Sequence, residues 1–185
     1  PCRLINIVEA GHPVPDNAGE KAARKILGIA SSLGADDLLV CLLSGGGSAL
    51  LSLPPTGIIL DEKRDLTREL LACGAGIHDI NTVRKHLSDI KGGRLAAAAF
   101  PARTVTLALS DVPGNDPATI ASGPTVGDAT SRKDALEILS AYGIKPPPSI
   151  KAKLASPTAE SPFPSDLKLT ASEIVITATA AEALD

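Results

Sequence analysis

Apolar residues gather in short runs along the chain, and longer amphipathic segments separate these runs. The most apolar run is Leu38–Leu43, in which six apolar residues follow one another, and this pattern predicts a strand buried on both faces. Shorter runs over residues 3–8, 104–109 and 173–177 predict three further strands. The sequence therefore predicts four strands spread along the whole chain.

Helical periodicity fills most of the intervals between these runs. Asp16 or Asn17 can cap a helix that extends to about residue 33 and stops at Gly34, with apolar residues three and four apart. Similar patterns predict helices that begin near residue 61, over 80–87 with Asp79 as its cap, over 131–142, over 149–155 and from 180 onward. Because residues 3–43 have the order strand, helix, strand, they predict a parallel βαβ unit.

The helix that begins near residue 61 mixes apolar and charged positions. Leu66, Leu70, Leu71 and Cys73 are predicted to point inward. Its charged residues, Lys63 among them, carry both signs, which is typical of a solvated face. We therefore expect these charged side chains to face solvent.

A glycine-rich turn follows the most apolar run directly. Ser44, Gly45, Gly46, Gly47 and Ser48 come before an apolar segment that could open a helix. Three glycines remove every Cβ from the turn, so backbone N–H groups can converge on a ligand. The serine hydroxyls and the positive end of the following helix would face the same point. The turn predicts a cradle for a phosphate or a carboxylate, and a tight turn that binds nothing is the alternative.

Polar residues are densest between residues 78 and 94. Asn81 and Arg84 are three apart and therefore lie on one side of the 80–87 helix, while Ile80, Val83 and Leu87 form a buried stripe on the opposite side. This arrangement presents an amide and a guanidinium group together. His78 and His86 have no visible partner in the sequence and are interpreted as ordinary histidines.

Two glycines between two cations then open an alanine-rich segment, in the order Lys91, Gly92, Gly93, Arg94. Free backbone N–H groups, a point charge and a forked guanidinium would act together there on an anion. The alternative is a helix junction that contains glycine and carries solvated cations. The coincidence of glycines and charges favours the anion site.

The 104–109 strand ends in a loop that holds Asp111 and Asp116. Residues just past the carboxyl end of a parallel strand face the ligand crevice, and carboxylates suit Mg²⁺ or general-base chemistry. A loop rich in turn-forming residues is the alternative. Ser122 and Gly123 in the next loop allow close backbone approach to a ligand.

Composition narrows the class of protein. Hydrophobic residues make up 44% and aromatic residues only 2% of the 185 residues, so the core must be aliphatic. A net charge of −3 argues against a general nucleic-acid binder. No apolar run is long enough to span a bilayer and no signal peptide is visible, so we expect a cytoplasmic protein.

Cysteine and methionine usage adds two expectations. Cys2, Cys41 and Cys73 are odd in number and widely spaced, which favours reduced thiols over a disulfide framework or a zinc site. The chain has no methionine and starts at Pro1. We therefore expect it to be an excerpt of a longer protein.

Five segments in this order resemble the type II glycerate kinases, the glycerate 2-kinase (MOFRL) family, whose members are also named hydroxypyruvate reductase. They are GHPVPD (11–16), SGGGSALL (44–51), NTVRKHLSDIKGGRLA (81–96), LSDVPGNDPATIASGPT (109–125) and VITATAAEAL (175–184). The resemblance implies an α/β fold, a three-layer α/β/α Rossmann-like domain with a mostly parallel sheet. Residues 1–185 would be the N-terminal domain, without a preceding segment and without the C-terminal MOFRL domain.

The resemblance also implies an activity. It is transfer of the ATP γ-phosphate to the 2-hydroxyl of D-glycerate with Mg²⁺, giving 2-phosphoglycerate, in a cleft between this domain and a smaller C-terminal one. The family's lysine before Pro1 and its arginine from the C-terminal domain are not in this sequence, so the chain alone is expected to be inactive. A small-molecule substrate is implied, with no nucleic acid and no membrane, and a homodimer is compatible with it.

These implications assign roles to the candidate residues as a hypothesis. The 44–48 turn and the 91–94 turn would hold the ATP phosphates and the glycerate carboxylate, in an order that the sequence leaves open. Lys91, Arg84 and Asn81 would be the catalytic residues, with Arg84 paired to an anionic oxygen and Asn81 orienting a hydroxyl. Asp111 or Asp116 would hold Mg²⁺. Ala49 follows Ser48, so this is not a Walker-type kinase.

Two other functions stay open. A hydroxypyruvate reductase that uses NAD(P)H would need G-x-G-x-x-G after the first strand, whereas residues 9–15 read EAGHPVP, which disfavours it. A non-catalytic domain that binds a sugar phosphate would use the same glycine-rich turns. Such a domain would bind its ligand without turnover.

Overall fold

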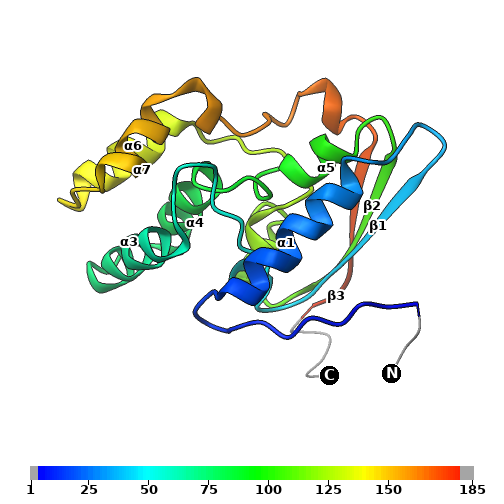
Figure 1. Ribbon diagram of the computed structural model, residues 1–185, viewed down its shortest axis with the longest axis horizontal. Helices are drawn as coiled ribbons and strands as arrows, with labels where there is room; N and C mark the ends of the chain where they lie inside the picture. Colours follow the sequence, from blue (N-terminus) through cyan, green and yellow to red (C-terminus); the bar gives the residue numbers. More distant parts are fainter. Residues whose placement is uncertain (1–3, 180–185) are drawn as a thin grey trace.

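A three-stranded parallel sheet is the centre of the fold. The computed structural model describes residues 4–179, and its strands are β1 (Leu38–Leu43), β2 (Arg103–Ser110) and β3 (Ser172–Thr179) in the spatial order β1-β2-β3. Leu39 pairs with Thr104 across the first interface, and the register shifts between Ala108 and Leu109 in the second. Runs 38–43, 104–109 and 173–177 are thus confirmed as strands, in the parallel sheet of an α/β protein (Figure 1).

Seven helices accompany the sheet in the described residues. The N-terminal half contains α1 (Asn17–Ala30), α2 (Gly47–Leu50), α3 (Leu60–Ala72), α4 (Ile77–His86) and α5 (Arg94–Ala99), and α6 (Arg132–Ala141) and α7 (Pro148–Ala155) follow. Short 3₁₀ turns lie at Pro113–Asn115, Ile120–Ser122, Pro157–Ala159 and Leu167–Leu169. None of the helices within residues 4–179 has the length and apolarity needed to cross a membrane.

Helix boundaries follow local capping. The Asp16 side chain accepts a hydrogen bond from Gly19 N and begins α1, as predicted, although α1 ends at Ala30. Ser131 and Asp134 form the predicted capping box of α6. Asp79 lies inside the first turn of α4 and does not cap it, because that helix begins earlier, after Gly76.

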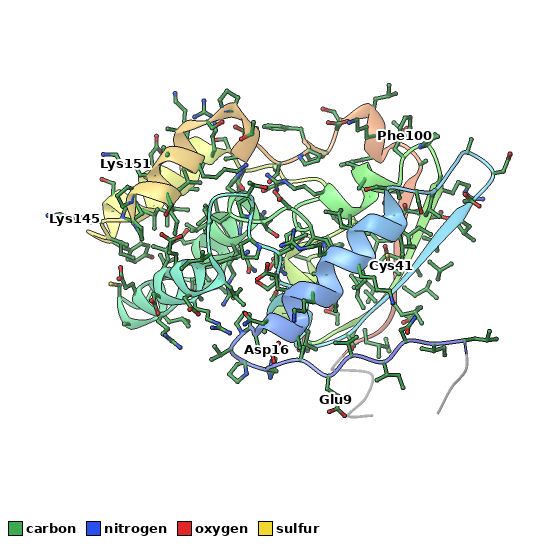
Figure 2. The ribbon with its side chains drawn as sticks, viewed as in Figure 1. Glu9, Asp16, Cys41, Phe100, Lys145 and Lys151 are labelled. Carbon is green, nitrogen blue, oxygen red and sulfur yellow. The ribbon has the colours of Figure 1, made fainter. Side chains whose placement is uncertain are left out.

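Helices cover one face of the sheet. Leu39 and Cys41 of β1 pack against an aliphatic cluster from α1 and α5, whose buried members include Ala23, Ala30 and Ala99. Cys41 lies on this covered face (Figure 2), and burial raises the pKa of its thiol to about 11. The low aromatic content is consistent with this small-residue packing.

The other face of the sheet is apolar and exposed. Leu38, Val40 and Leu42 alternate with the covered residues, and Leu42 is 76% exposed. The prediction that β1 is buried on both faces is therefore wrong for residues 4–179, because α1 and α5 both pack on the same side. For the same reason the described residues do not form the expected three layers, and helices cover a single face (Figure 1).

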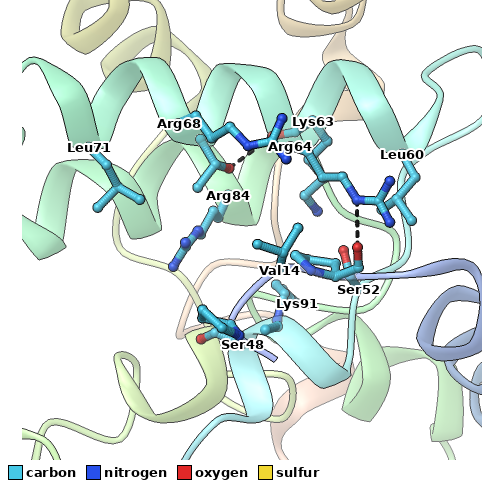
Figure 3. Close-up of a pocket in the computed structure, with 14 residues that line it drawn as sticks. Val14, Ser48, Ser52, Leu60, Lys63, Arg64, Arg68, Leu71, Arg84 and Lys91 are labelled. Atoms are coloured by element: carbon cyan, nitrogen blue, oxygen red, sulfur yellow. Dashed lines mark hydrogen bonds between the residues drawn. The ribbon is translucent and has the colours of Figure 1, made fainter. Parts of the chain in front are cut away.

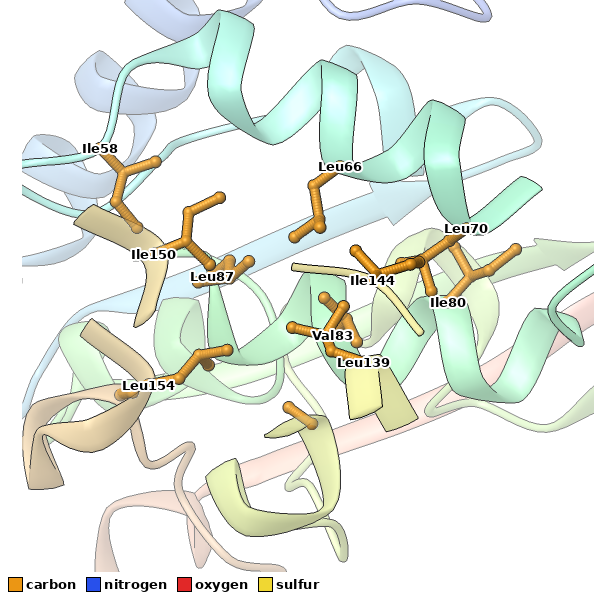
Figure 4. Packing of buried hydrophobic residues seen from close by; sticks show 12 residues of the cluster. Ile58, Leu66, Leu70, Ile80, Val83, Leu87, Leu139, Ile144, Ile150 and Leu154 are labelled. Atoms are coloured by element: carbon orange, nitrogen blue, oxygen red, sulfur yellow. The ribbon is translucent and has the colours of Figure 1, made fainter. Parts of the chain in front are cut away.

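A separate helical lobe lies beside the sheet. Helices α3, α4, α6 and α7 pack around their own core, in which Leu66, Leu70, Val83 and Leu139 are buried together (Figure 4). Figure 1 shows these four helices on the far side of the molecule from the sheet. Ile80, Val83 and Leu87 form the buried stripe predicted for α4.

Three expectations about local structure are corrected or lie outside the described part. Residues 4–8 form no strand and are exposed, with Leu4 at 96%, so the predicted βαβ unit does not form there. Leu71 and Cys73 are exposed instead of pointing inward. The helix expected from residue 180 falls outside the described residues.

Candidate active site

The glycine-rich turn lies at the carboxyl end of β1, as predicted. A Cβ on Gly45 would come within 2.6 Å of Asp111 Oδ2, and one on Gly47 within 2.7 Å of the Ala121 Cβ. The turn therefore needs glycine at position 47 for its packing against Ala121, whereas the Asp111 side chain beside Gly45 is exposed and can rotate away. The helix that follows, α2, is a single turn of four residues, so it contributes little of the dipole that the sequence suggested.

A chain of side-chain hydrogen bonds ties this turn to α4. Ser48 Oγ lies 2.9 Å from Ser122 Oγ, and Ser122 Oγ donates to Asn81 Oδ1 at 3.1 Å. Because a hydroxyl has one proton to donate, Ser122 accepts from Ser48. Asn81 and Ser122 are both buried, so this chain fixes the position of Ser48 relative to Asn81.

These residues surround a hollow of about 260 Å³ at the end of the sheet. The glycine turn, Asn81, Arg84, Asp111 and His12 line it. They come from four separate segments of the chain. The structure thus brings together Ser44–Ser48, Asn81, Arg84 and Asp111, which the sequence proposed separately.

A second, smaller pocket of about 130 Å³ adjoins this hollow. Its charged lining consists of Lys63, Arg64, Arg68, Arg84 and Lys91, and apolar residues form much of the rest (Figure 3). Arg84 and Ser48 belong to the lining of both cavities. The two cavities are therefore neighbours that share a wall.

Lys63 is a pocket residue that the sequence analysis placed on a solvated face. It is only 6% exposed, and its Nζ has no hydrogen-bond partner among the described residues. Burial, with repulsion from Arg84 and Arg94, lowers the pKa of the Lys63 amine to about 7. The helical spacing of Lys63 is a signal in the sequence that could have identified it. Lys63 stands three and seven residues before the buried Leu66 and Leu70, which places it on the same face of α3.

Lys91 is buried as well, with 1% of its surface exposed. Its Nζ donates to the Ala121 carbonyl at 3.1 Å. Burial, followed by repulsion from Lys63 and Arg84, holds the pKa of this amine well below its usual value. The predicted cation therefore lies at the site, but it reaches the small pocket from the interior.

The rest of the predicted 91–94 anion site is occupied by internal hydrogen bonds. Gly92 N and Gly93 N donate to the carbonyls of Ser122 and Gly123, at 3.1 and 2.8 Å. Arg94 donates to the carbonyls of Lys85, Lys91, Ala159 and Glu160 and to Ser161 Oγ. Gly92, Gly93 and Arg94 line neither cavity, so their role is to hold loops together.

Gly123 also has a packing role. Its φ is +57°, and a Cβ there would lie 3.0 Å from the Ala118 carbonyl oxygen. Ser122 next to it has φ +61°, which is uncommon outside glycine. The strained segment presents the Ser122 hydroxyl, and Gly123 itself stays away from both cavities.

The two predicted metal ligands separate in space. Asp111 is exposed and lines the larger hollow. The Asp116 carboxylate instead accepts from Ala118 N and Thr119 Oγ1, at 3.0 and 2.7 Å. No group of three potential metal ligands occurs within residues 4–179. Asp111 alone suits Mg²⁺, which binds through one or two carboxylates together with substrate phosphates.

A buried ion pair anchors the helix that carries Asn81 and Arg84. Lys85 Nζ lies 2.6 Å from Asp128 Oδ1, and both side chains are buried. Asp128 also accepts from Thr130. Next to this pair, His86 Nδ1 lies 3.0 Å from the Ala159 carbonyl, and burial lowers the pKa of the imidazole. These contacts hold α4 in place behind the site.

Comparison with known proteins identifies relatives of this chain. Residues 1–155 match a family described as a domain of unknown function, DUF4147. A protein of Agrobacterium vitis with the provisional name hydroxypyruvate reductase is 51% identical over 190 residues, covering 100% of this chain and 43% of that protein. The D-glycerate 2-kinase of Thermotoga maritima is 49% identical over 154 residues, covering 83% of this chain and 37% of that protein.

A solved structure agrees with these sequence relatives. The crystal structure of glycerate kinase from Thermotoga maritima has a TM-score of 0.90 and 43% identity, over 98% of this chain and 42% of that chain. This chain thus spans less than half the length of these relatives. The α/β fold and the resemblance to glycerate kinases are confirmed. The chain belongs to the DUF4147 family and is a homologue of the glycerate kinases.

Proposed function

We propose that the full-length protein to which this chain belongs is an ATP-dependent D-glycerate 2-kinase, and that the larger hollow is part of its active site. The observation that carries the proposal is the meeting of the glycine turn, Asn81, Arg84 and Asp111 around one cavity, in a homologue of a protein named D-glycerate 2-kinase. The chain spans only part of such a protein, so other segments would complete the site.

Phosphoryl transfer asks a protein mainly for positioning and for neutralisation of charge. Arg84 supplies a fixed positive charge at the border of both cavities. Ser48 lies at the end of the hydrogen-bond chain through Ser122, so its hydroxyl oxygen faces a ligand in a defined orientation. Asn81 is buried behind it and keeps that orientation.

Mg²⁺ and ATP fit this hollow as its cofactor and phosphate donor. Asp111 would hold the metal directly or through water, since it is exposed and has no partner that neutralises it among the residues described. The metal would neutralise phosphate charge when bound. The backbone of the glycine turn would then lie against the phosphates, with Arg84 on the other side. Gly92, Gly93, Arg94 and Asp116 are left out of this proposal because their polar groups are engaged elsewhere.

Phosphorus NMR of the full-length protein with ATP, Mg²⁺ and D-glycerate tests the proposal. A 2-phosphoglycerate resonance should appear as ATP is consumed. A product that is only 3-phosphoglycerate would overturn the assignment to the 2-hydroxyl. Folded protein that yields no phosphorylated product would overturn the kinase, and oxidation of NADH with hydroxypyruvate would then assign the reductase.

A variant pair ties the activity to the hollow. Arg84→Gln removes the shared cation, and turnover should fall about 100-fold or more. Arg103→Gln is the matched control, because Arg103 is exposed at the start of β2 and pairs with the exposed Glu173. Equal turnover in the two variants would place the active site elsewhere.

A further inference from the structure

Five basic residues line the smaller pocket, and three of them have no neutralising acid among the described residues. Arg64 and Arg68 pair with Asp61 and Asp65 on α3, and the three that form no ion pair in the described part of the chain are Lys63, Arg84 and Lys91. Lys63 comes from α3, Arg84 from α4 and Lys91 from the turn before α5, and Figure 3 shows the two lysines entering the pocket from opposite sides. Among residues 4–179, no carboxylate forms an ion pair with any of the three. Burial lowers the pKa of Lys63, and the charge of Asp89 raises it slightly, but Asp89 lies beyond ion-pair distance.

Such an arrangement is costly unless an anion completes it. Buried charges without a partner are strongly disfavoured. The Lys63 Nζ is buried and makes no hydrogen bond, and Lys91 has one carbonyl acceptor for its three protons. The pocket therefore offers unused donors and positive charge to an oxyanion.

The dimensions and walls of the pocket restrict the kind of anion. Its volume of about 130 Å³ is half that of the larger hollow, at about 260 Å³, so the smaller pocket suits a small ligand better than the hollow does. Val14, Leu60 and Leu71 contribute apolar walls beside the cations. A small organic acid, with a carboxylate at one end and carbon at the other, matches both features.

The pocket also opens toward the proposed site of phosphoryl transfer. Arg84, Ser48 and Pro13 line both this pocket and the larger hollow. We infer that Lys63, Arg84 and Lys91 form the subsite for the carboxylate of the small hydroxy acid, whose hydroxyl then points past Ser48 toward the glycine turn. This inference rests on the proposed kinase function, and it assigns the nucleotide to the larger hollow.

The same oxyanion chemistry could come from a phosphoryl group of the nucleotide, so the experiment separates the two sources. Calorimetry measures the affinity of the full-length protein for D-glycerate without ATP, and for ADP without D-glycerate. The variant is Lys63→Met, which keeps the length of the side chain and removes the charge. Lys151→Met is the matched control, because Lys151 lies on the outer surface of α7 (Figure 2).

Loss of a charge-assisted hydrogen bond should weaken D-glycerate binding about 10- to 100-fold in Lys63→Met. Binding of ADP should be unchanged, and the control should match the wild type for both ligands. In steady-state kinetics, the KM for D-glycerate should rise while the KM for ATP stays constant. A general loss of structure would not raise the KM for D-glycerate while leaving the KM for ATP constant.

Three outcomes would overturn the inference. Wild-type affinity for D-glycerate in Lys63→Met would remove Lys63 from the subsite, and so would failure of the wild type to bind any small hydroxy acid. Weakened ADP binding with normal D-glycerate binding would assign the pocket to the nucleotide. If Lys63→Met does not fold, Lys63→Gln repeats the test with a polar side chain.

Failure of the inference and failure of the proposed function are distinguishable. A protein that makes 2-phosphoglycerate with a Lys63-independent affinity for D-glycerate keeps the kinase and loses the subsite. A protein that binds the acid through Lys63 but transfers no phosphate keeps the subsite and loses the kinase.

Discussion

The hydroxyl of Ser48 lies 2.9 Å from the hydroxyl of Ser122, although 74 residues separate them in the sequence. This contact connects the glycine turn after β1 to the strained segment after β2. Through Ser122 it continues to Asn81 on α4. The glycine turn, the segment after β2 and helix α4 are therefore coupled through the buried Ser122 hydroxyl. Removal of this hydroxyl should affect both the stability of the protein and the geometry of the site.

Ser122→Ala tests this coupling. The change removes the donor to Asn81 Oδ1 and leaves that buried oxygen unpaired, which should cost about 1–3 kcal/mol of unfolding free energy. Urea denaturation measures it, and turnover should fall because Ser48 loses its acceptor. Ser140→Ala on the exposed side of α6 is the control and should change neither quantity. An unchanged unfolding free energy in Ser122→Ala would mean that water replaces the hydroxyl.

Gly47→Ala tests the steric demand of the glycine turn. The new methyl group would lie 2.7 Å from the Ala121 Cβ, so one of the two loops must move, at about 1–3 kcal/mol. A displacement of this size at the site should lower turnover about 100-fold. Measurement of turnover and thermal unfolding in the full-length protein checks both effects.

Gly28→Ala is the control for Gly47→Ala, because it changes a glycine that has no close neighbour. Nothing lies within 4 Å of a Cβ at this exposed position of α1, so alanine should raise stability by roughly 0.5–1 kcal/mol. Full activity is expected there. If both glycine variants behaved alike, close packing would not be the reason for glycine at position 47.

Asp128→Asn tests the buried pair behind α4. Lys85 would lose its partner at 2.6 Å while remaining buried, so the unfolding free energy should drop by about 3–5 kcal/mol. The pair Arg68–Asp65 has nearly the same length, 2.7 Å, but is largely exposed. Asp65→Asn should therefore cost less than about 1 kcal/mol. Chemical denaturation of the two variants compares a buried with an exposed pair at nearly the same N–O distance, and equal losses would contradict this account.

Lys63→Met should alter the pH dependence of stability. The folded amine has a pKa of about 7, whereas the unfolded amine titrates near about 10.4. Between these values folding releases a proton, so the unfolding free energy contributed by Lys63 rises with pH. Below about pH 7 both states are charged, and the full cost of burying the charge is present.

Methionine at position 63 removes this cost. The variant should therefore be more stable than the wild type at pH 6, with an advantage that shrinks as the pH rises toward about 10. Urea denaturation across this range measures the difference, with Lys151→Met as control. A difference that stays constant with pH would show that Lys63 does not titrate in the predicted direction.

Local signals in the sequence were sufficient for much of the secondary structure. Strands β1, β2 and β3 and the capped starts of α1 and α6 appear where the pattern places them. A capping side chain and the backbone N–H that donates to it lie within four residues, so their interaction survives in almost any tertiary setting. Residues 4–8 have the same apolar character as a strand but find no partner strand in the described structure, and pattern alone cannot supply one.

The candidate site residues also divide into those that a local sequence pattern identifies and those that depend on the tertiary structure. The turn 44–48, Asn81, Arg84 and Asp111 were identifiable because each carries an unusual local pattern, and the structure places them around one cavity. Lys63 was assigned to solvent because a lysine on a charged helix is normally exposed. Gly92, Gly93 and Arg94 look like an anion site, but their donors are used by carbonyls from residues 122–123 and 159–160.

By itself, the sequence determined the alternation of helices and strands, the aliphatic nature of the core and the family to which the chain belongs. Only the tertiary structure decided which face of β1 is covered, which glycines serve packing, and which buried cations face a cavity. The physical reason is the separation along the chain over which each kind of interaction acts. Propensity, capping and periodicity act within a few residues, whereas desolvation and unmet hydrogen bonds depend on segments that meet across the fold. Lys63 and Lys91 acquire their lowered pKa values only when α3 and the turn before α5 close on the same pocket.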